Sequence, residues 1–191
     1  MKVWPTRHRR PARTMADFTW KVGAKVLLVV GIVAFGAFYI SERYVLGLDT
    51  QETRCLDEWV YVIDTWDRPT AAETERDQYV AVRMTDAQTP ANALWRPGQV
   101  MVKRAVATLP GDAVTVGRDG VRVRRGDASW THGSGLAAAQ KLGLSADALS
   151  RQFILAPGEM LLMGDHPMSY DGRYYGPAHE DQVIGRVLWA F

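Results

Sequence analysis

A lysine inside an apolar strand is the first residue of this sequence that could do chemistry. The segment Met101–Asp112, MVKRAVATLPGD, has the composition of a strand that ends in a Leu-Pro-Gly-Asp turn. In a strand, Lys103 shares one side with Met101, Ala105 and Ala107. Burial among such neighbours disfavours the ammonium form, and a neutral amine is a general base at neutral pH. The alternative is a solvated edge-strand lysine that prevents aggregation.

A second stretch, MGDHPMSYDGRYYGP, places polar groups at alternating positions of a loop. A strand ends in Gly-Asp, and the loop that follows carries Ser169, Asp171 and Arg173. Judged by its residues alone, the Asp171–Arg173 pair could be an ordinary surface ion pair, which contributes little stability. The four histidines have no metal-ligand spacing, and the sequence has no glycine-rich phosphate loop. The sequence therefore predicts neither a metal nor a cofactor.

Together and in this order, the two stretches resemble the motifs of the type I signal peptidases. The closer similarity is to the TraF-like peptidases of bacterial conjugation systems, and it covers most of residues 22–191. The resemblance implies that Lys103 is the general base and that Ser169 orients its amine through a hydrogen bond. It also implies that Asp171 pairs with Arg173 and fixes the loop.

The resemblance further requires a nucleophile between a membrane span and the first long strand. Cys55 aligns with that position, where the family usually has a serine, and Asp57 replaces a proline that is common there. Because Cys55 is the only cysteine, it cannot form an intramolecular disulfide. The alternatives are a small buried hydrophobic residue, the usual fate of a free cysteine, or another nucleophile among Thr50, Thr53 and Ser41. We favour a thiol nucleophile.

A Cys–Lys dyad is chemically coherent. The thiolate is the reactive form of cysteine, and a neutral Lys103 within reach would remove the thiol proton. Attack on a peptide carbonyl would give an acyl-enzyme, and the lysine would return the proton to the leaving amine. The backbone N–H of Cys55 is the family-like donor to the oxyanion.

A basic segment followed by an apolar segment begins the chain. Residues 1–25 carry seven basic side chains and one acid, whereas Val26–Ile40 has neither charge nor proline. Extended to 22–41, the apolar segment reaches about the 20 residues that a bilayer requires. The positive-inside rule then places residues 1–21 in the cytoplasm and residues 42–191 in the periplasm, on a single-pass anchor in the bacterial inner membrane.

Three alternatives to an anchor are disfavoured by the sequence. A cleaved signal peptide needs an Ala-x-Ala type site, and SERYVLGLD offers none. A buried core helix is disfavoured because apolar residues cover every helix face. Lipoprotein processing is disfavoured because QETRC lacks the small and apolar residues that it needs.

The remaining 150 residues predict a mainly β, signal-peptidase-like folded sheet or barrel, with tight turns between short strands. RDGV at 118–121 is typical of a hairpin turn, and 135–151 has the composition of a short helical insertion. The expected strands are 58–65, 77–84, 98–107, 112–117, 120–125, 152–157, 159–165 and 182–191.

The resemblance thus implies an endopeptidase that processes an exported precursor, such as a pilin of a conjugation or type IV secretion system. Its partners would be the precursor, the inner membrane and proteins of the conjugation apparatus. Nucleic acid is not expected, because the net charge is only +2 and the basic tail is explained by topology. The alternatives are an inactive peptidase-fold assembly protein and a general signal peptidase.

Overall fold

The structure, a computed structural model, describes residues 15–50, 54–89, 96–133 and 135–191. The chain divides into two compact units, Met1–Glu42 and Arg43–Phe191. In the described part of the first unit, the chain forms helix α1 (Met15–Arg43), which extends beyond the expected anchor segment at both ends. Within it, Thr19–Arg43 has a mean hydropathy of 2.1 and is long and apolar enough to cross a membrane. The described structure therefore contains one N-terminal helix compatible with a single-pass anchor.

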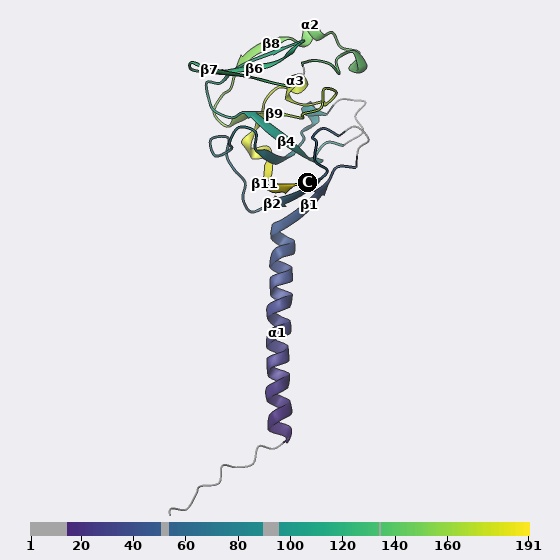
Figure 1. The fold of residues 1–191 in the computed structure, drawn as a ribbon, viewed down its shortest axis with the longest axis vertical. Helices are drawn as coiled ribbons and strands as arrows, with labels where there is room; N and C mark the ends of the chain where they lie inside the picture. Colours follow the sequence, from purple (N-terminus) through teal and green to yellow (C-terminus); the bar gives the residue numbers. More distant parts are fainter. Residues whose placement is uncertain (1–14, 51–53, 90–95, 134) are drawn as a thin grey trace, which may run out of the picture. The chain divides into compact units, whose positions relative to one another are not determined.

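A folded, seven-stranded antiparallel sheet organises the described residues of the second unit (Figure 1). Its strand order is β1-β2-β11-β3-β4-β9-β10, so that the C-terminal strand lies between strands from the N-terminal half of the unit. The strands are β1 (Tyr44–Leu48), β2 (Val60–Asp64), β3 (Tyr79–Arg83), β4 (Val100–Ala107), β9 (Glu159–Met163), β10 (Ala178–His179) and β11 (Val183–Ala190).

A second, four-stranded sheet has the order β7-β6-β5-β8. Strands β5 and β6 form the hairpin expected at RDGV, in which Gly117 pairs with Gly120. Gly120 has a φ of 153°, and a Cβ there would lie 3.1 Å from the carbonyl oxygen of Gly133, so both backbone and space favour glycine. The strands are β5 (Ala113–Gly117), β6 (Gly120–Arg125), β7 (Ala128–His132) and β8 (Arg151–Ile154).

The Leu-Pro-Gly-Asp turn joins the two sheets through a buried carboxylate. Asp112 accepts hydrogen bonds from the backbone N–H groups of Thr108 and Leu109 and from the guanidinium of Arg125. Around this turn, Val106 and Ala107 of β4 pack in one hydrophobic cluster with valines of β5 and β6. The turn residues therefore fix where β4 ends and the second sheet begins.

Several elements differ from the sequence expectation. The segment 135–151 holds only a 3-10 turn, η2 (Gln140–Leu142), and a single helical turn, α2 (Ala146–Leu149), because Gly143 in the left-handed conformation ends the first. The short strands β1, β7 and β10 were not predicted. The other short helices are α3 (Gly172–Tyr175), η1 (Asp86–Gln88) and η3 (Glu180–Gln182).

Candidate active site

Lys103 is completely buried in the middle of β4, opposite Val80 of β3. Its Nζ has no hydrogen-bond partner among the described residues. A solvated edge-strand lysine is therefore excluded, and the amine is held in a desolvated position. Burying an amine without a hydrogen-bond partner destabilises the fold. Folding therefore does not explain why a lysine stands at this position, and Lys103 is a candidate functional residue.

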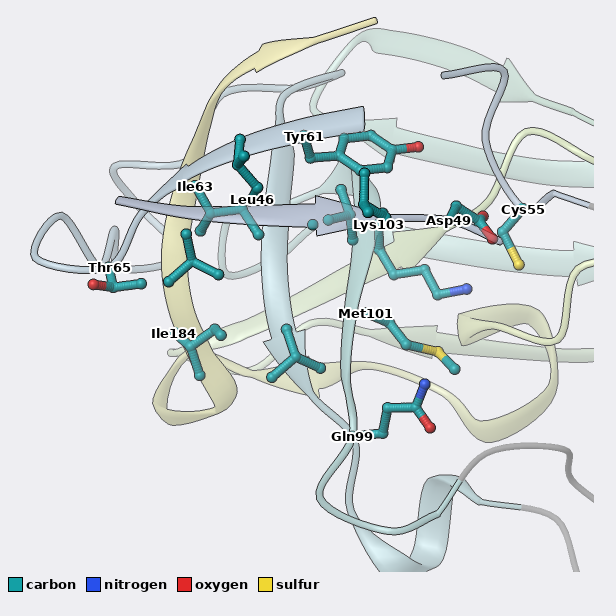
Figure 2. A pocket seen from close by; sticks show the side chains of 15 residues that line it. Leu46, Asp49, Cys55, Tyr61, Ile63, Thr65, Gln99, Met101, Lys103 and Ile184 are labelled. Carbon is teal, nitrogen blue, oxygen red and sulfur yellow. The ribbon is translucent and has the colours of Figure 1, made fainter. Parts of the chain in front are cut away.

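A pocket of about 320 Å³ contains both Lys103 and Cys55 (Figure 2). Figure 2 shows the lysine amine extending toward the end of the pocket where Cys55 and Asp49 lie. Strands β1 and β4 supply most of the lining. Its residues are Val45–Asp49, Cys55, Tyr61, Ile63, Thr65, Gln99–Lys103 and Ile184.

Cys55 lies in the segment before β2 and is partly exposed, so it is not a buried core residue. Its carbonyl oxygen accepts hydrogen bonds from the backbone N–H of His166, at 3.1 Å, and from Ser169 Oγ, at 3.4 Å. The structure contains no hydrogen bond between the Cys55 sulfur and Lys103 Nζ. The two side chains share the pocket without contact of that kind.

Ser169 is buried beside the Cys55 backbone. The resemblance implied a hydrogen bond from Ser169 to the Lys103 amine, but in the structure its hydroxyl donates to the Cys55 carbonyl instead. Gly164 makes this contact possible, because a Cβ there would lie 2.4 Å from Ser169 Oγ and 2.7 Å from the Cys55 carbonyl oxygen. The glycine of the Gly-Asp motif thus has a steric role.

Asp171 and Arg173 form a fully buried ion pair at 2.6 Å, and not a surface pair. Asp171 also accepts from the Gly164 N–H, while Arg173 donates to the carbonyl oxygens of His166 and Ser169. Burial by itself lowers the pKa of Arg173, but the hydrogen bonds that Arg173 donates to Asp171 and the attraction of that carboxylate together outweigh burial, and the pKa is raised. The pair therefore ties the loop into one rigid unit.

A network that the sequence did not reveal joins this loop to β3 and β4. Arg104 donates two hydrogen bonds of 2.6 Å to Asp165, and it also donates to the hydroxyl of Tyr79. The Tyr79 hydroxyl donates in turn to the Glu58 carboxylate at 2.7 Å. Burial, followed by this hydrogen bond, raises the pKa of Tyr79. The one sequence signal for this network is the position of Arg104 directly after Lys103.

Of the other candidate nucleophiles, neither Ser41 nor Thr50 lines the pocket. The Ser41 hydroxyl donates to the Phe38 carbonyl within α1, Thr50 is exposed after β1, and Thr53 lies outside the described residues. Among the residues that the structure describes, no three His, Cys, Asp or Glu side chains are grouped to hold a metal ion.

The comparison with protein families identifies the class to which this fold belongs. The chain belongs to the signal peptidase family, peptidase S26, whose profile matches residues 19–191. It is a signal peptidase I-like peptidase, and the expected mainly β fold of this class is confirmed.

One solved structure similar to the chain is a signal peptidase I from Enterococcus faecalis V583, at 22% identity and a TM-score of 0.35. The match covers 59% of this chain and 95% of that chain. No curated protein matches.

Proposed function

We propose that this peptidase is a membrane-anchored endopeptidase that cleaves an exported precursor through Cys55 and Lys103. One observation carries the proposal: a completely buried lysine amine, unpartnered within the described structure, shares a pocket with the only cysteine of the chain. Both groups are needed for a thiol nucleophile with a lysine base.

Two strand edges at the pocket suit an extended peptide substrate. Strand β1 pairs only with β2 among the described strands. In β4, pairing with β9 begins at Arg104, so the same edge of Val100–Lys103 has no strand partner within the described residues. A peptide that adds to such edges gains backbone hydrogen bonds, while its alternate side chains enter the pocket.

The chemistry would proceed in two steps. Lys103 Nζ removes the proton of the Cys55 thiol after a side-chain rotation brings the two groups together, and the thiolate sulfur bonds to the peptide carbonyl carbon. As the C–N bond breaks, the lysine ammonium returns the proton to the leaving nitrogen. Water, deprotonated by the same amine, then hydrolyses the thioester and regenerates the thiol.

The site supports this sequence by holding the Cys55 segment in place. Two hydrogen bonds fix the Cys55 carbonyl on the loop that contains Ser169. A fixed segment keeps the Cys55 N–H available as an oxyanion donor, since such donors act best when they are preorganised. We assign Ser169, Asp171 and Arg173 supporting roles in this arrangement.

For topology, we propose a cytoplasmic tail at 1–21, an inner-membrane anchor at 22–41 and a periplasmic catalytic domain at 42–191. The excess of basic residues before the apolar segment supports this orientation. The similarity to TraF-like peptidases supports a pilin precursor of a conjugation or type IV secretion system as substrate, with proteins of that apparatus as partners.

An inactive assembly protein is the second candidate function. The cysteine in place of the usual serine and the lack of a Cys55–Lys103 hydrogen bond favour it. Precursor conversion in cells, followed by mass spectrometry, separates the two. Loss of conversion in both Cys55→Ala and Lys103→Ala supports the peptidase, whereas normal conversion and assembly in both supports the assembly protein.

A further inference from the structure

We infer that Tyr79 and Glu58 are positioning residues that hold the Cys55 segment in register with Lys103; this inference rests on the proposed Cys–Lys chemistry. Neither residue lines the pocket. Their link to the site is the hydrogen bond of 2.7 Å from the Tyr79 hydroxyl to the Glu58 carboxylate. Glu58 stands three residues after Cys55 in the same segment.

Two tyrosines of the seven-stranded sheet donate hydrogen bonds to Glu58. The Tyr61 hydroxyl donates to the Glu58 carbonyl oxygen at 2.6 Å, while Tyr79 binds the carboxylate. The two rings meet edge to face, with centroids 6.2 Å apart. Glu58 is therefore held through its backbone and its side chain by strands β2 and β3.

Arg104 connects the Tyr79–Glu58 hydrogen bond to β4, the strand that contains Lys103. Arg104 directly follows Lys103 in β4 and lies opposite Tyr79 in the β3–β4 register. Its guanidinium stacks over the Tyr79 ring, 4.5 Å from the centroid, and donates to the Tyr79 hydroxyl. A donor that is itself bonded to a cation gives a stronger hydrogen bond to a carboxylate.

The connections close into a ring. From Arg104 the ring passes to Asp165, whose neighbour His166 donates its backbone N–H to the Cys55 carbonyl. From Cys55 the chain leads to Glu58 and back through Tyr79 to Arg104. The segment of Cys55 is thus held at two points, the carbonyl of Cys55 and the side chain of Glu58 three residues later. Without the Tyr79–Glu58 bond, the segment would keep the His166 and Ser169 contacts at the Cys55 carbonyl and the Tyr61 contact at the Glu58 carbonyl, but the Glu58 side chain would lose its hydrogen bond to β3.

The test uses the single cysteine of the full-length, detergent-solubilised chain. The rate of iodoacetamide alkylation at pH 7 in wild type, divided by that in Lys103→Met, measures how far the lysine assists the thiol. We expect this ratio to be at least about three in the wild type and to fall by about threefold or more, toward one, in a Tyr79→Phe background. Glu58→Ala should lower the ratio as much as Tyr79→Phe does. The double variant should lower it no further than either single variant, because both changes break the same hydrogen bond. Glu58→Gln, which keeps an acceptor oxygen, should restore most of the ratio.

Tyr44→Phe is the matched control, because the Tyr44 hydroxyl has no hydrogen bond in the described structure. For precursor cleavage, we expect Tyr79→Phe to lower kcat about tenfold with KM within twofold, since the pocket lining is unchanged. An undiminished alkylation ratio in Tyr79→Phe would overturn the positioning role alone. A ratio of one in the wild-type chain would contradict the proposed assistance of the Cys55 thiol by Lys103, and the present inference would fail with it.

Discussion

Gly164 and Cys55 approach each other so closely that a single methyl group on Gly164 would lie 2.7 Å from the Cys55 carbonyl oxygen. The contacting atom is backbone, which cannot rotate away as a flexible side chain would. The loop of Ser169 and the segment of the candidate nucleophile therefore fit together only while this position has no side chain.

Replacing Gly164 with alanine should displace the Cys55 segment. We expect precursor conversion to fall by at least tenfold, because a shift of about 1 Å in a reacting group costs roughly that or more. Gly117→Ala is the control, since a Cβ at Gly117 lies 3.9 Å from its nearest contact. Equal conversion rates in the two variants, measured by gel or mass spectrometry, would show that the close approach has no functional role.

Exchanging the nucleophile atom tests the thiol directly. Cys55→Ala should abolish conversion, whereas Cys55→Ser should reduce it, because a hydroxyl is far harder to deprotonate than a thiol. A thiol-alkylating reagent should inhibit the wild type and spare the serine variant. If Cys55→Ala converts precursor normally while Lys103→Ala does not, the nucleophile is another residue, with Thr53 or Thr50 as the next candidates.

Breaking the buried Asp171–Arg173 pair should destabilise the domain. Asp171→Asn leaves the Arg173 guanidinium completely buried without its counter-charge. We expect a loss of about 3–5 kcal/mol in the free energy of unfolding. Asp147→Asn makes the same chemical change in the exposed Arg118–Asp147 pair and should have little effect. Thermal unfolding by circular dichroism compares the two, and similar melting temperatures would contradict the prediction.

The stabilising effect of Asp112 should depend on pH. Burial alone raises the pKa of its carboxyl, but the hydrogen bond from Arg125, with those from Leu109 and Thr108, holds the pKa below its ordinary value of 3.8. A lowered pKa in the folded state means that the carboxylate stabilises the fold above pH 3.8 and loses this effect as pH falls further. The difference in unfolding free energy between wild type and Asp112→Asn should therefore be constant from about pH 7 to 5 and shrink below about pH 4. A difference that stays constant to pH 3 would refute this.

Membrane topology has its own test. A reporter fused after Phe191 should be active only in the periplasm, and the full-length chain should stay with the membrane fraction. A soluble fragment that begins near Ser41 would instead indicate a cleaved signal peptide.

The sequence could predict the long strands because their β-branched residues stand between strong turn signals. The sequence does not predict the short strand β1, since YVLGL directly follows the apolar helix and contains a glycine. The helical insertion was overestimated, because composition does not reveal where Gly143 ends a turn. Local patterns therefore determined the long elements better than the short ones.

For the candidate site, motif spacing identified residues but not their partners. The sequence could place Ser169 on a loop, yet whether its hydroxyl meets Lys103 or the Cys55 backbone depends on how closely Gly164 approaches. Tyr79 and Glu58 carry no motif, and their hydrogen bond forms only because β3 pairs with β4 in one register. Such contacts between distant segments need the tertiary fold.

The pocket floor has a consequence for protein engineering. Tyr61 and Ile63 line the pocket and also belong to a hydrophobic core cluster, with 3% of their surfaces exposed. Changing them to alter substrate range would also weaken folding, as large-to-small core substitutions do. Gln99 and Val100 line the same pocket from exposed positions on its rim. A directed-evolution library confined to these rim positions would therefore explore new cleavage preferences with the smallest loss of folded, expressible variants.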